Sequence, residues 1–180
     1  MAKIAFIGLG NMGGPMAANL CKAQHHVMAF DLSDGAVAQA VEKGAHKAAT
    51  AAAAVKDAEI VVTMLPAGKH VREVYEKDVL PNVAKGALLI DCSTIDVESA
   101  VQAHGLAAKH GAASVDAPVS GGTGGAKAAT LTFMAGGSEP AFAAAKPVLE
   151  KMGKKIVHCG GAGAGQAAKI CNNMILGISM

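Results

Sequence analysis

Short apolar runs alternate with alanine-rich segments of helical periodicity, and this alternation constrains the fold of the chain more than any other feature. Five of the runs have the length and apolar richness of buried parallel strands: residues 3–8, 26–30, 59–65, 87–92 and 113–118. The segments between them repeat their apolar residues with a helical period, over residues 11–23, 33–44, 67–80 and 96–111. Repeated strand–helix units predict an α/β fold built on a doubly wound, mostly parallel sheet.

The rest of the pattern marks helix ends and extends the sheet. Four residues are the predicted helix ends: Ser33 and Asp96 as N-caps, and Gly44 and Gly111 as C-terminal stops. Two further strands, over residues 130–137 and 155–160, flank a helix at 139–152 and are expected to lengthen the sheet at one edge. The alanine-biased stretch 49–58 is most simply a short helix.

The composition is that of one soluble domain with no nucleic-acid or membrane partner. The 180 residues are 52% hydrophobic, which suffices for one substantial core. The sequence shows no sign of a nucleic-acid-binding surface, because its net charge is only +2, its aromatic content is 3% and its basic residues do not cluster. No run of about 18 apolar residues could span a membrane, and the first apolar run is too short for a signal peptide, so a cytoplasmic location is expected.

The cysteines are too scattered to form a recognisable site. They are Cys21, Cys92, Cys159 and Cys171. Without a C-x-x-C pair they indicate neither a zinc site nor a secreted disulfide framework, and we expect reduced thiols that are mostly buried.

The first chemical motif follows the first predicted strand and opens the first predicted helix. It consists of six residues: Gly8, Leu9, Gly10, Asn11, Met12 and Gly13. Glycines in such a turn let the backbone approach a pyrophosphate, and the helix N-terminus offers unpaired N–H donors and partial positive charge. With Asp31 about 20 residues further on, this context predicts a Rossmann-type dinucleotide site. A plain tight turn is the alternative.

Asp31 bears on the choice of dinucleotide. A carboxylate at the end of the second strand accepts hydrogen bonds from the adenosine ribose hydroxyls. Leu32 and Ser33 follow it, so no arginine is placed to receive a 2′-phosphate, and NAD is favoured over NADP. Asp31 could instead cap the helix that starts near Ser33.

Three loops lie at predicted carboxyl ends of strands, where ligands bind in such sheets. Pro66 ends one strand in the run Met64-Leu65-Pro66, and Asp91-Cys92-Ser93-Thr94 ends the next with hydroxyl groups. Ordinary turn chemistry would explain either. The third loop, residues 116–122, places Ser120, Gly121 and Gly122 after a proline, so that consecutive N–H groups and one hydroxyl can face an anion such as a carboxylate. A flexible surface loop is the alternative here.

The last segment, GAGAGQAAKICNNMILGISM, predicts a glycine turn that leads into a helix. Lys169 and Asn173 lie one turn apart on it and therefore share a face. Ile170, Met174 and Ile178 lie on another face and are expected to pack. From spacing alone, a surface lysine that reaches into solvent is the ordinary interpretation of Lys169.

Three stretches together resemble the β-hydroxyacid dehydrogenase family, most closely its branch that acts on 3-hydroxyisobutyrate. They are G-L-G-N-M-G-G-P-M-A-A-N-L, D-A-P-V-S-G-G and G-A-G-Q-A-A-K-I-C-N-N-M, which occur in this order over the whole chain. The resemblance implies that Gly8 to Gly13 and Asp31 bind NAD, with Leu65, Pro66 and Thr94 lining the cofactor. It also implies that Ser120, Gly121 and Gly122 hold the substrate carboxylate, that Lys169 is the catalytic base, and that Asn173 orients the substrate or the lysine. No metal is implied.

The implied reaction is the NAD-dependent oxidation of 3-hydroxyisobutyrate to methylmalonate semialdehyde in valine degradation. A lysine acts as a base near neutrality only if desolvation and the positive nicotinamide lower its pKa from about 10.4. Two positions depart from the family pattern. Ala129 stands where relatives often carry glycine, which would stiffen the loop, and His25-His26 replaces a frequent Gly-His. We interpret the two histidines as a turn rather than a metal site.

The resemblance also predicts the domain organisation. Residues 1–162 are expected to form the NAD-binding domain and 163–180 the first part of an interdomain helix, with the all-helical C-terminal domain outside this chain. The 180-residue chain is then expected to bind NAD but to turn over substrate poorly, and the full-length protein to be a homo-oligomer.

Other functions share parts of the pattern. Tartronate, glyoxylate and succinic semialdehyde reductases use the same scaffold. Phosphogluconate dehydrogenases also carry Lys-x-x-x-Asn, but a preference for a 2′-phosphate fits poorly with Asp31. A non-catalytic NAD-binding module is the alternative outside the enzymes, because a fold alone does not fix a function.

Overall fold

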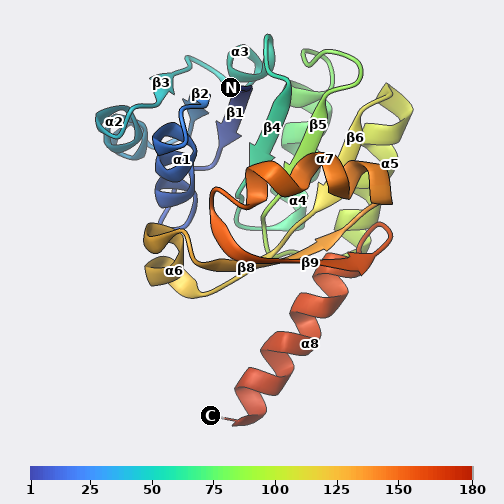
Figure 1. Cartoon of the computed structure of the whole chain (residues 1–180). Coiled ribbons are helices and arrows are strands. Elements are labelled where there is room, and N and C mark those ends of the chain that lie inside the picture. Colours follow the sequence, from blue (N-terminus) through green and yellow to red (C-terminus); the bar gives the residue numbers. More distant parts are fainter. Residues whose placement is uncertain (180) are drawn as a thin grey trace.

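The computed structural model describes residues 1–179 and contains one nine-stranded sheet with helices on both faces (Figure 1). The order is β3-β2-β1-β4-β5-β6-β8-β7, and β9 pairs with β8. The strands are β1 (Lys3–Ile7), β2 (His26–Phe30), β3 (His46–Lys47), β4 (Ile60–Thr63), β5 (Leu88–Asp91), β6 (Ala113–Asp116), β7 (Val119–Ser120), β8 (Leu131–Gly136) and β9 (Gly153–Gly160). Strands β1 to β6 pair in parallel, whereas β8 is antiparallel to β6 and β7 and parallel to β9. The predicted doubly wound, mostly parallel fold is confirmed.

The helices form two layers over this sheet. They are α1 (Gly13–Lys22), α2 (Asp34–Glu42), α3 (Ala51–Val55), α4 (Gly68–Val74), α5 (Val97–His110), α6 (Gly122–Ala128), α7 (Glu139–Leu149) and α8 (Ala164–Ser179), with a π-helical turn, η1 (Tyr75–Val79), after α4. One core lies between the sheet and α1, α2 and α7, and the other between the sheet and α3, α4, η1 and α5. On β1, Ile4 and Phe6 enter the first core and Ala5 and Ile7 the second. Because both faces are covered, the central strands are continuous apolar runs.

Most predicted helix ends are confirmed. Ser33 Oγ accepts a hydrogen bond from the Ala36 N–H of α2 at 3.3 Å, and Asp96 Oδ1 accepts one from the Ser99 N–H of α5 at 2.7 Å. Gly111 ends α5 with φ of +81°. The alanine-biased stretch forms α3, and the predicted helix at 67–80 is α4 continued by η1.

Three elements were not predicted: β3, β7 and α6. Helix α6 contains three glycines in seven residues, GTGGAKA, a composition that disfavours a helix in isolation. Tertiary contacts support it instead, because the side-chain Nδ2 of Asn19 in α1 donates to the carbonyl of Ala126 at 2.7 Å in a buried position. Ala129 ends the helix in the left-handed conformation, φ +56°, which explains why glycine suits this position.

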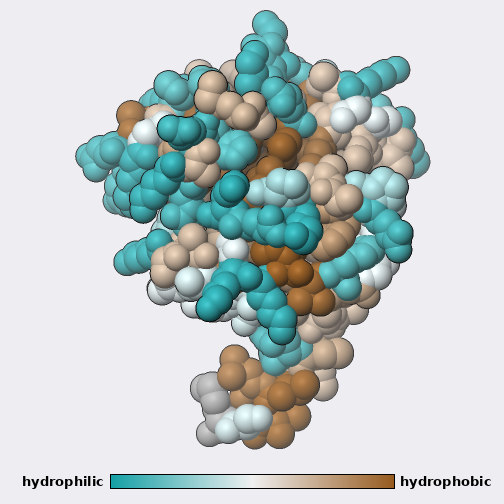
Figure 2. Space-filling view, viewed as in Figure 1, coloured by the Kyte–Doolittle hydropathy of each residue, from teal (hydrophilic) through white to brown (hydrophobic). Residues whose placement is uncertain are grey.

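Two expectations about burial are wrong. Ile170, Met174 and Ile178 are 43%, 60% and 82% exposed rather than packed, because α8 projects away from the body of the molecule (Figure 1). The apolar side chains near its end form the brown lobe in Figure 2. Of the free cysteines only Cys92 is buried, so the thiols are not mostly buried.

The two edges of the sheet are short or charged. Strand β3 has two residues, and β9 exposes Lys154 and Lys155. His26 begins β2 and its ring stacks on His46 of β3, with centroids 4.5 Å apart. No helix among residues 1–179 combines the length and apolar character needed to cross a membrane.

Candidate functional site

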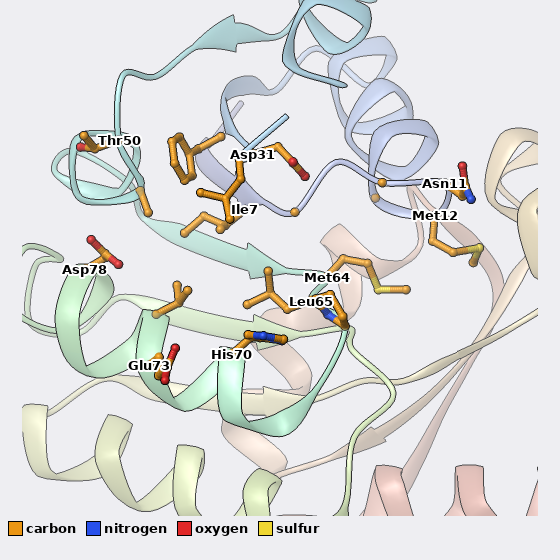
Figure 3. A pocket seen from close by; sticks show the side chains of 18 residues that line it. Ile7, Asn11, Met12, Asp31, Thr50, Met64, Leu65, His70, Glu73 and Asp78 are labelled. Atoms are coloured by element: carbon orange, nitrogen blue, oxygen red, sulfur yellow. The ribbon is translucent and has the colours of Figure 1, made fainter. Parts of the chain in front are cut away.

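A groove of about 730 Å³ opens at the carboxyl ends of β1, β2 and β4 (Figure 3). The neighbours of β1 are β2 on one side and β4 on the other, so the chain reverses its direction of winding here. Ligands of open α/β sheets bind at this kind of switch point. The walls include the glycine turn, the end of β2, the residues after β4, and one face of α4 and η1.

The glycine turn is shaped by close backbone contacts. A Cβ atom at Gly8 would lie 2.2 Å from the carbonyl oxygen of Met64, and one at Gly13 would lie 1.9 Å from the carbonyl oxygen of Gly8. Gly8 also has φ of +95°. Gly10, by contrast, lines the groove, and a Cβ there would meet nothing within 4 Å. Gly8 and Gly13 therefore let the turn form, and Gly10 leaves open space on its ligand side.

The N-terminus of α1 has no side-chain cap. Met12 at the N-cap makes no capping hydrogen bond, whereas Ser33, Thr50, Asp96 and Ser138 cap α2, α3, α5 and α7. The first N–H groups of a helix need acceptors, and the helix dipole favours negative charge there. The uncapped end borders the groove, so the site fits the pyrophosphate of a dinucleotide.

Asp31 links the first two strands at the edge of the groove. Its Oδ2 accepts a hydrogen bond from the Leu9 N–H at 2.6 Å, and its Oδ1 accepts one from the Ser33 N–H at 2.8 Å. The cap of α2 is Ser33, so capping that helix is not the role of Asp31. A carboxylate has about four acceptor sites, and the half-buried Asp31 keeps capacity for ribose hydroxyls.

The far wall of the groove carries polar residues that sequence reasoning missed. His70 and Glu73 of α4 and Asp78 of η1 line it, opposite Asp31 (Figure 3). The Nδ1 atom of His70 is buried without a hydrogen-bond partner in the described part of the chain. The spacing of three residues from His70 to Glu73 puts both on one helical face, which was a usable signal.

A hydrogen bond to a serine side chain connects the loop after β4 with the loop after β5. Leu65 and Pro66 line the groove, and the Leu65 N–H donates to Ser93 Oγ at 2.8 Å. Thr94 is exposed and lies outside the groove lining. The residues on either side of it contact α8, because Gln166 Nε2 donates to the Ser93 carbonyl at 2.7 Å and the Ile95 N–H donates to Gln166 Oε1 at 3.1 Å.

The predicted substrate loop contains the short strand β7 and the start of α6. Ser120 ends β7, and Gly121 is the N-cap residue of α6. Gly121 and Gly122 have φ of +130° and +61°, conformations that glycine adopts without strain. All three residues lie outside the lining of the groove.

Lys169 is buried and Asn173 is exposed. The lysine is 8% exposed, so it is not a side chain that reaches freely into solvent. Burial lowers the pKa of the Lys169 amine below its ordinary value, because desolvation disfavours the charged form. Asn173 lies one turn further along α8, with its Oδ1 3.4 Å from Asn172 Nδ2. Neither residue lines the groove, but α8 reaches the loop after β5 through Gln166.

A buried carboxyl lies behind the site. Asp91 is 4% exposed, and its Oδ1 accepts hydrogen bonds from Thr63 Oγ1 and from the backbone and hydroxyl of Ser93. Its Oδ2 has no partner in the described structure. Burial raises the pKa of Asp91 to about 6. Asp91 also borders an internal cavity of about 10 Å³, together with Tyr75 and Asp116. Among residues 1–179, no three His, Cys, Asp or Glu side chains converge as a metal site requires.

Comparison with known proteins agrees with this geometry. Residues 3–161 match the family model of the NAD binding domain of 6-phosphogluconate dehydrogenase. The chain is 57% identical over its whole length to 3-hydroxyisobutyrate dehydrogenase of Pseudomonas aeruginosa, and 50% identical to the NAD-dependent L-serine dehydrogenase of the same organism. It covers 61% of each of these proteins.

A solved structure of 3-hydroxyisobutyrate dehydrogenase from Mycobacterium tuberculosis with L-serine superposes with a TM-score of 0.96 at 53% identity, over 98% of this chain and 60% of that one. The chain thus spans about three fifths of the length of these relatives. The fold, the uncapped helix end and the family model lead to one conclusion: the chain belongs to the family of the NAD binding domain of 6-phosphogluconate dehydrogenase.

Proposed function

We propose that this chain provides the cofactor site and the catalytic lysine of an NAD-dependent dehydrogenase that oxidises 3-hydroxyisobutyrate to methylmalonate semialdehyde. The observation that carries the proposal is Lys169, a buried lysine whose pKa is lowered by desolvation. It lies one turn after Gln166, which contacts the loop at the carboxyl end of β5. The cofactor groove opens at the same edge of the sheet.

The groove fits NAD better than NADP. Asp31 lines the groove, where its carboxylate would accept hydrogen bonds from ribose hydroxyls, and Leu32 beside it is 96% exposed and uncharged. Glu73 and Asp78 add acidic groups on the opposite wall, where a 2′-phosphate would be repelled. When bound, NAD supplies the hydride acceptor. In this proposal residues 1–162 form the cofactor domain and 163–180 begin the interdomain helix.

Other residues of the chain are assigned to proton transfer, to binding of the substrate carboxylate and to orientation of the substrate. Neutral Lys169 takes the proton of the substrate hydroxyl at Nζ, and the desolvation that lowers its pKa favours this neutral form. The hydroxyl of Ser120 and the N–H groups of Gly121 and Gly122 hold the substrate carboxylate. Asn173, on the same side of α8 as Lys169, orients the substrate through its amide.

L-serine is the second candidate substrate. One relative, 50% identical, is named NAD-dependent L-serine dehydrogenase, and the Mycobacterium tuberculosis structure is described with L-serine. Serine and 3-hydroxyisobutyrate are both β-hydroxy acids that differ at the central carbon, where an amino group replaces a methyl group. A carboxylate clamp and a lysine base serve either one.

The larger assembly is also part of the proposal. We infer a homo-oligomeric, cytoplasmic enzyme. Met174, Ile175 and Leu176 of α8 are 60%, 67% and 54% exposed, which supports an association surface on this helix. Sedimentation of the wild type and of a triple serine variant at these positions tests this part, because the variant is expected to sediment as a smaller species.

The test of the activity separates cofactor binding from chemistry. NAD and NADP are titrated by fluorescence, and single-turnover NADH formation is followed at high protein concentration with 3-hydroxyisobutyrate, L-serine and 6-phosphogluconate. With tartronate semialdehyde, which accepts a hydride, the oxidation of NADH is followed instead. Lys169→Ala is expected to lower the rate by about 10²-fold or more with unchanged NAD affinity. Lys155→Ala, at an exposed position on β9, is the matched control. A rate in Lys169→Ala within a factor of two of the wild type refutes the assignment.

A further inference from the structure

Helix α8 is held to the body of the molecule only near its start. Its buried residues are Gly165, Gln166 and Lys169, and from Ile170 onward most of its side chains are exposed. A helix that projects in this way can tilt about its first turn. The position of Lys169 therefore depends on what fixes residues 163–166.

Asp116, at the end of β6, holds that first turn. It is 2% exposed. Its Oδ1 accepts a hydrogen bond from the Gly163 N–H and its Oδ2 accepts one from the Gln166 N–H, both at 2.9 Å. A carboxylate at the N-terminus of a helix satisfies orphan N–H donors and interacts favourably with the helix dipole. The cap of α8 thus comes from a residue about fifty positions earlier in the chain.

A histidine of α5 also contacts the carboxylate of Asp116. His104 Nε2 of α5 lies 2.9 Å from Asp116 Oδ1, and His104 Nδ1 lies 2.6 Å from Ser114 Oγ. Both ring nitrogens therefore have partners on β6. This contact sets the rotamer of Asp116, so that the carboxylate faces α8 rather than the substrate loop that follows it.

Two glycines make room for this arrangement. A Cβ atom at Gly165 would lie 2.8 Å from Asp116 Oδ2 and 2.3 Å from the carbonyl oxygen of Met134. A Cβ at Gly136 would lie 2.5 Å from Asp116 Oδ1. Any larger residue at either position would push α8 away from the carboxylate, so the close approach is built into the sequence.

Gln166 carries the connection on to the cofactor groove. Its backbone N–H is bound by Asp116, and its fully buried side chain holds the Ser93 carbonyl and the Ile95 N–H. Ser93 Oγ in turn accepts from the Leu65 N–H in the groove wall. One hydrogen-bonded chain thus runs from the groove to the turn that precedes Lys169.

We infer that Asp116 is a positioning residue for Lys169: by capping α8 and fixing Gln166 it sets where the amine lies relative to the groove. The inference rests on the proposed function only for its catalytic consequence. Both carboxylate oxygens of Asp116 are engaged by protein groups, so it acts through α8 and does not touch the substrate.

The experiment measures the lysine directly and needs neither substrate nor cofactor. The protein is pulse-labelled with acetic anhydride between pH 7 and 11, and acetylation of Lys169 and of exposed Lys155 is read by mass spectrometry of their peptides. Asp116→Asn keeps the shape of the side chain but replaces one carboxylate oxygen with an NH2 group. That group cannot accept the hydrogen bond that Gly163 or Gln166 donates to the oxygen. Labelling of Lys169 is expected to become about tenfold faster, with its titration midpoint moved up toward the ordinary value of a lysine.

Two controls isolate the effect. Asp34→Asn removes a surface carboxylate whose side chain is 92% exposed, and Val37→Ala destabilises the core of α2 without touching α8. Both should leave the labelling of Lys169 unchanged. Unchanged labelling in a folded Asp116→Asn variant overturns the inference. If that variant does not fold, His104→Gln decides: faster labelling supports the inference and unchanged labelling overturns it.

Turnover then distinguishes this inference from the proposed function. If Lys169 is the base, the pH at which the single-turnover rate is half-maximal should rise in Asp116→Asn together with the midpoint from labelling, because the base must be deprotonated. If labelling of Lys169 changes in Asp116→Asn but the Lys169→Ala variant is still active, the positioning role of Asp116 stands and the catalytic role of Lys169 is refuted.

Discussion

Replacing Asp91 with asparagine should remove a large part of the pH dependence of stability between about pH 4 and pH 7. The carboxyl is 4% exposed, and burial raises its pKa from 3.8 to about 6, although hydrogen bonds from Ser93 and Thr63 act in the opposite direction. The folded state therefore binds this proton more tightly than the unfolded state does. Stability from this group is fully present below pH 3.8 and is lost as the pH rises through about 6.

The magnitude follows from the two pKa values. A difference of about 2.2 pH units at about 1.36 kcal/mol each corresponds to about 3 kcal/mol of unfolding free energy. Asparagine has no charge to desolvate and keeps one oxygen as an acceptor for Thr63 and Ser93. Its NH2 group would take the place of Oδ2, which has no hydrogen-bond partner in the described structure.

Urea unfolding at half-unit steps from pH 4 to pH 8 measures this effect. The free energy of unfolding of the wild type minus that of Asp91→Asn should fall by about 2.5 kcal/mol from pH 4 to pH 8, because the first part of the full change already occurs below pH 4. Asp34→Asn, at an exposed position, serves as the matched control. A difference between wild type and Asp91→Asn that stays constant within about 0.5 kcal/mol would show that the buried carboxyl is not destabilised by its charge.

Three further substitutions test the packing around the site. Gly13→Ala places a Cβ 1.9 Å from the carbonyl of Gly8 and should lower the unfolding free energy by about 1–3 kcal/mol and weaken NAD binding, so an unchanged melting temperature would contradict it. Asn19→Ala leaves the buried carbonyl of Ala126 without its donor and should cost about 1–3 kcal/mol in urea unfolding; a loss below about 0.5 kcal/mol would count against the bond. Ala129→Gly relieves the φ of +56° and should stabilise by about 0.5–1 kcal/mol, and a lower melting temperature would refute the strain.

The sheet and most of its helices were predictable because local signals agree with the tertiary structure. The apolar run at 26–30 is β2 with the same bounds, and Ser33 and Asp96 are the caps that the sequence predicts. Helix α6 was not predictable, because its glycines favour a turn locally and the hydrogen bond from Asn19 to Ala126 joins positions 107 residues apart. The left-handed conformation of Ala129 likewise depends on this tertiary context.

For the site, the sequence predicted the placement of some residues and not of others. The glycine turn, Asp31, Leu65 and Pro66 meet at one groove, as the motif and the strand ends predict. The burial of Lys169 could not be predicted from the sequence of its own helix. It results from contacts of α8 with β6, β8, β9 and α5, which are distant in sequence or belong to another layer of the fold. The roles of Thr94, Ser120 and Asn173 stay predictions, since these residues lie outside the groove lining.

The edges of the sheet have a consequence for solubility. A foreign strand that docked beside β9 would have to desolvate the ammonium groups of Lys154 and Lys155, and one that docked beside β3 would find a ladder only two residues long. The lysines of β9 and the shortness of β3 therefore disfavour open-ended strand addition, the step by which β-rich proteins polymerise into fibres. Copies of this molecule that meet at high concentration are therefore expected to associate through side-chain surfaces more readily than through paired backbones.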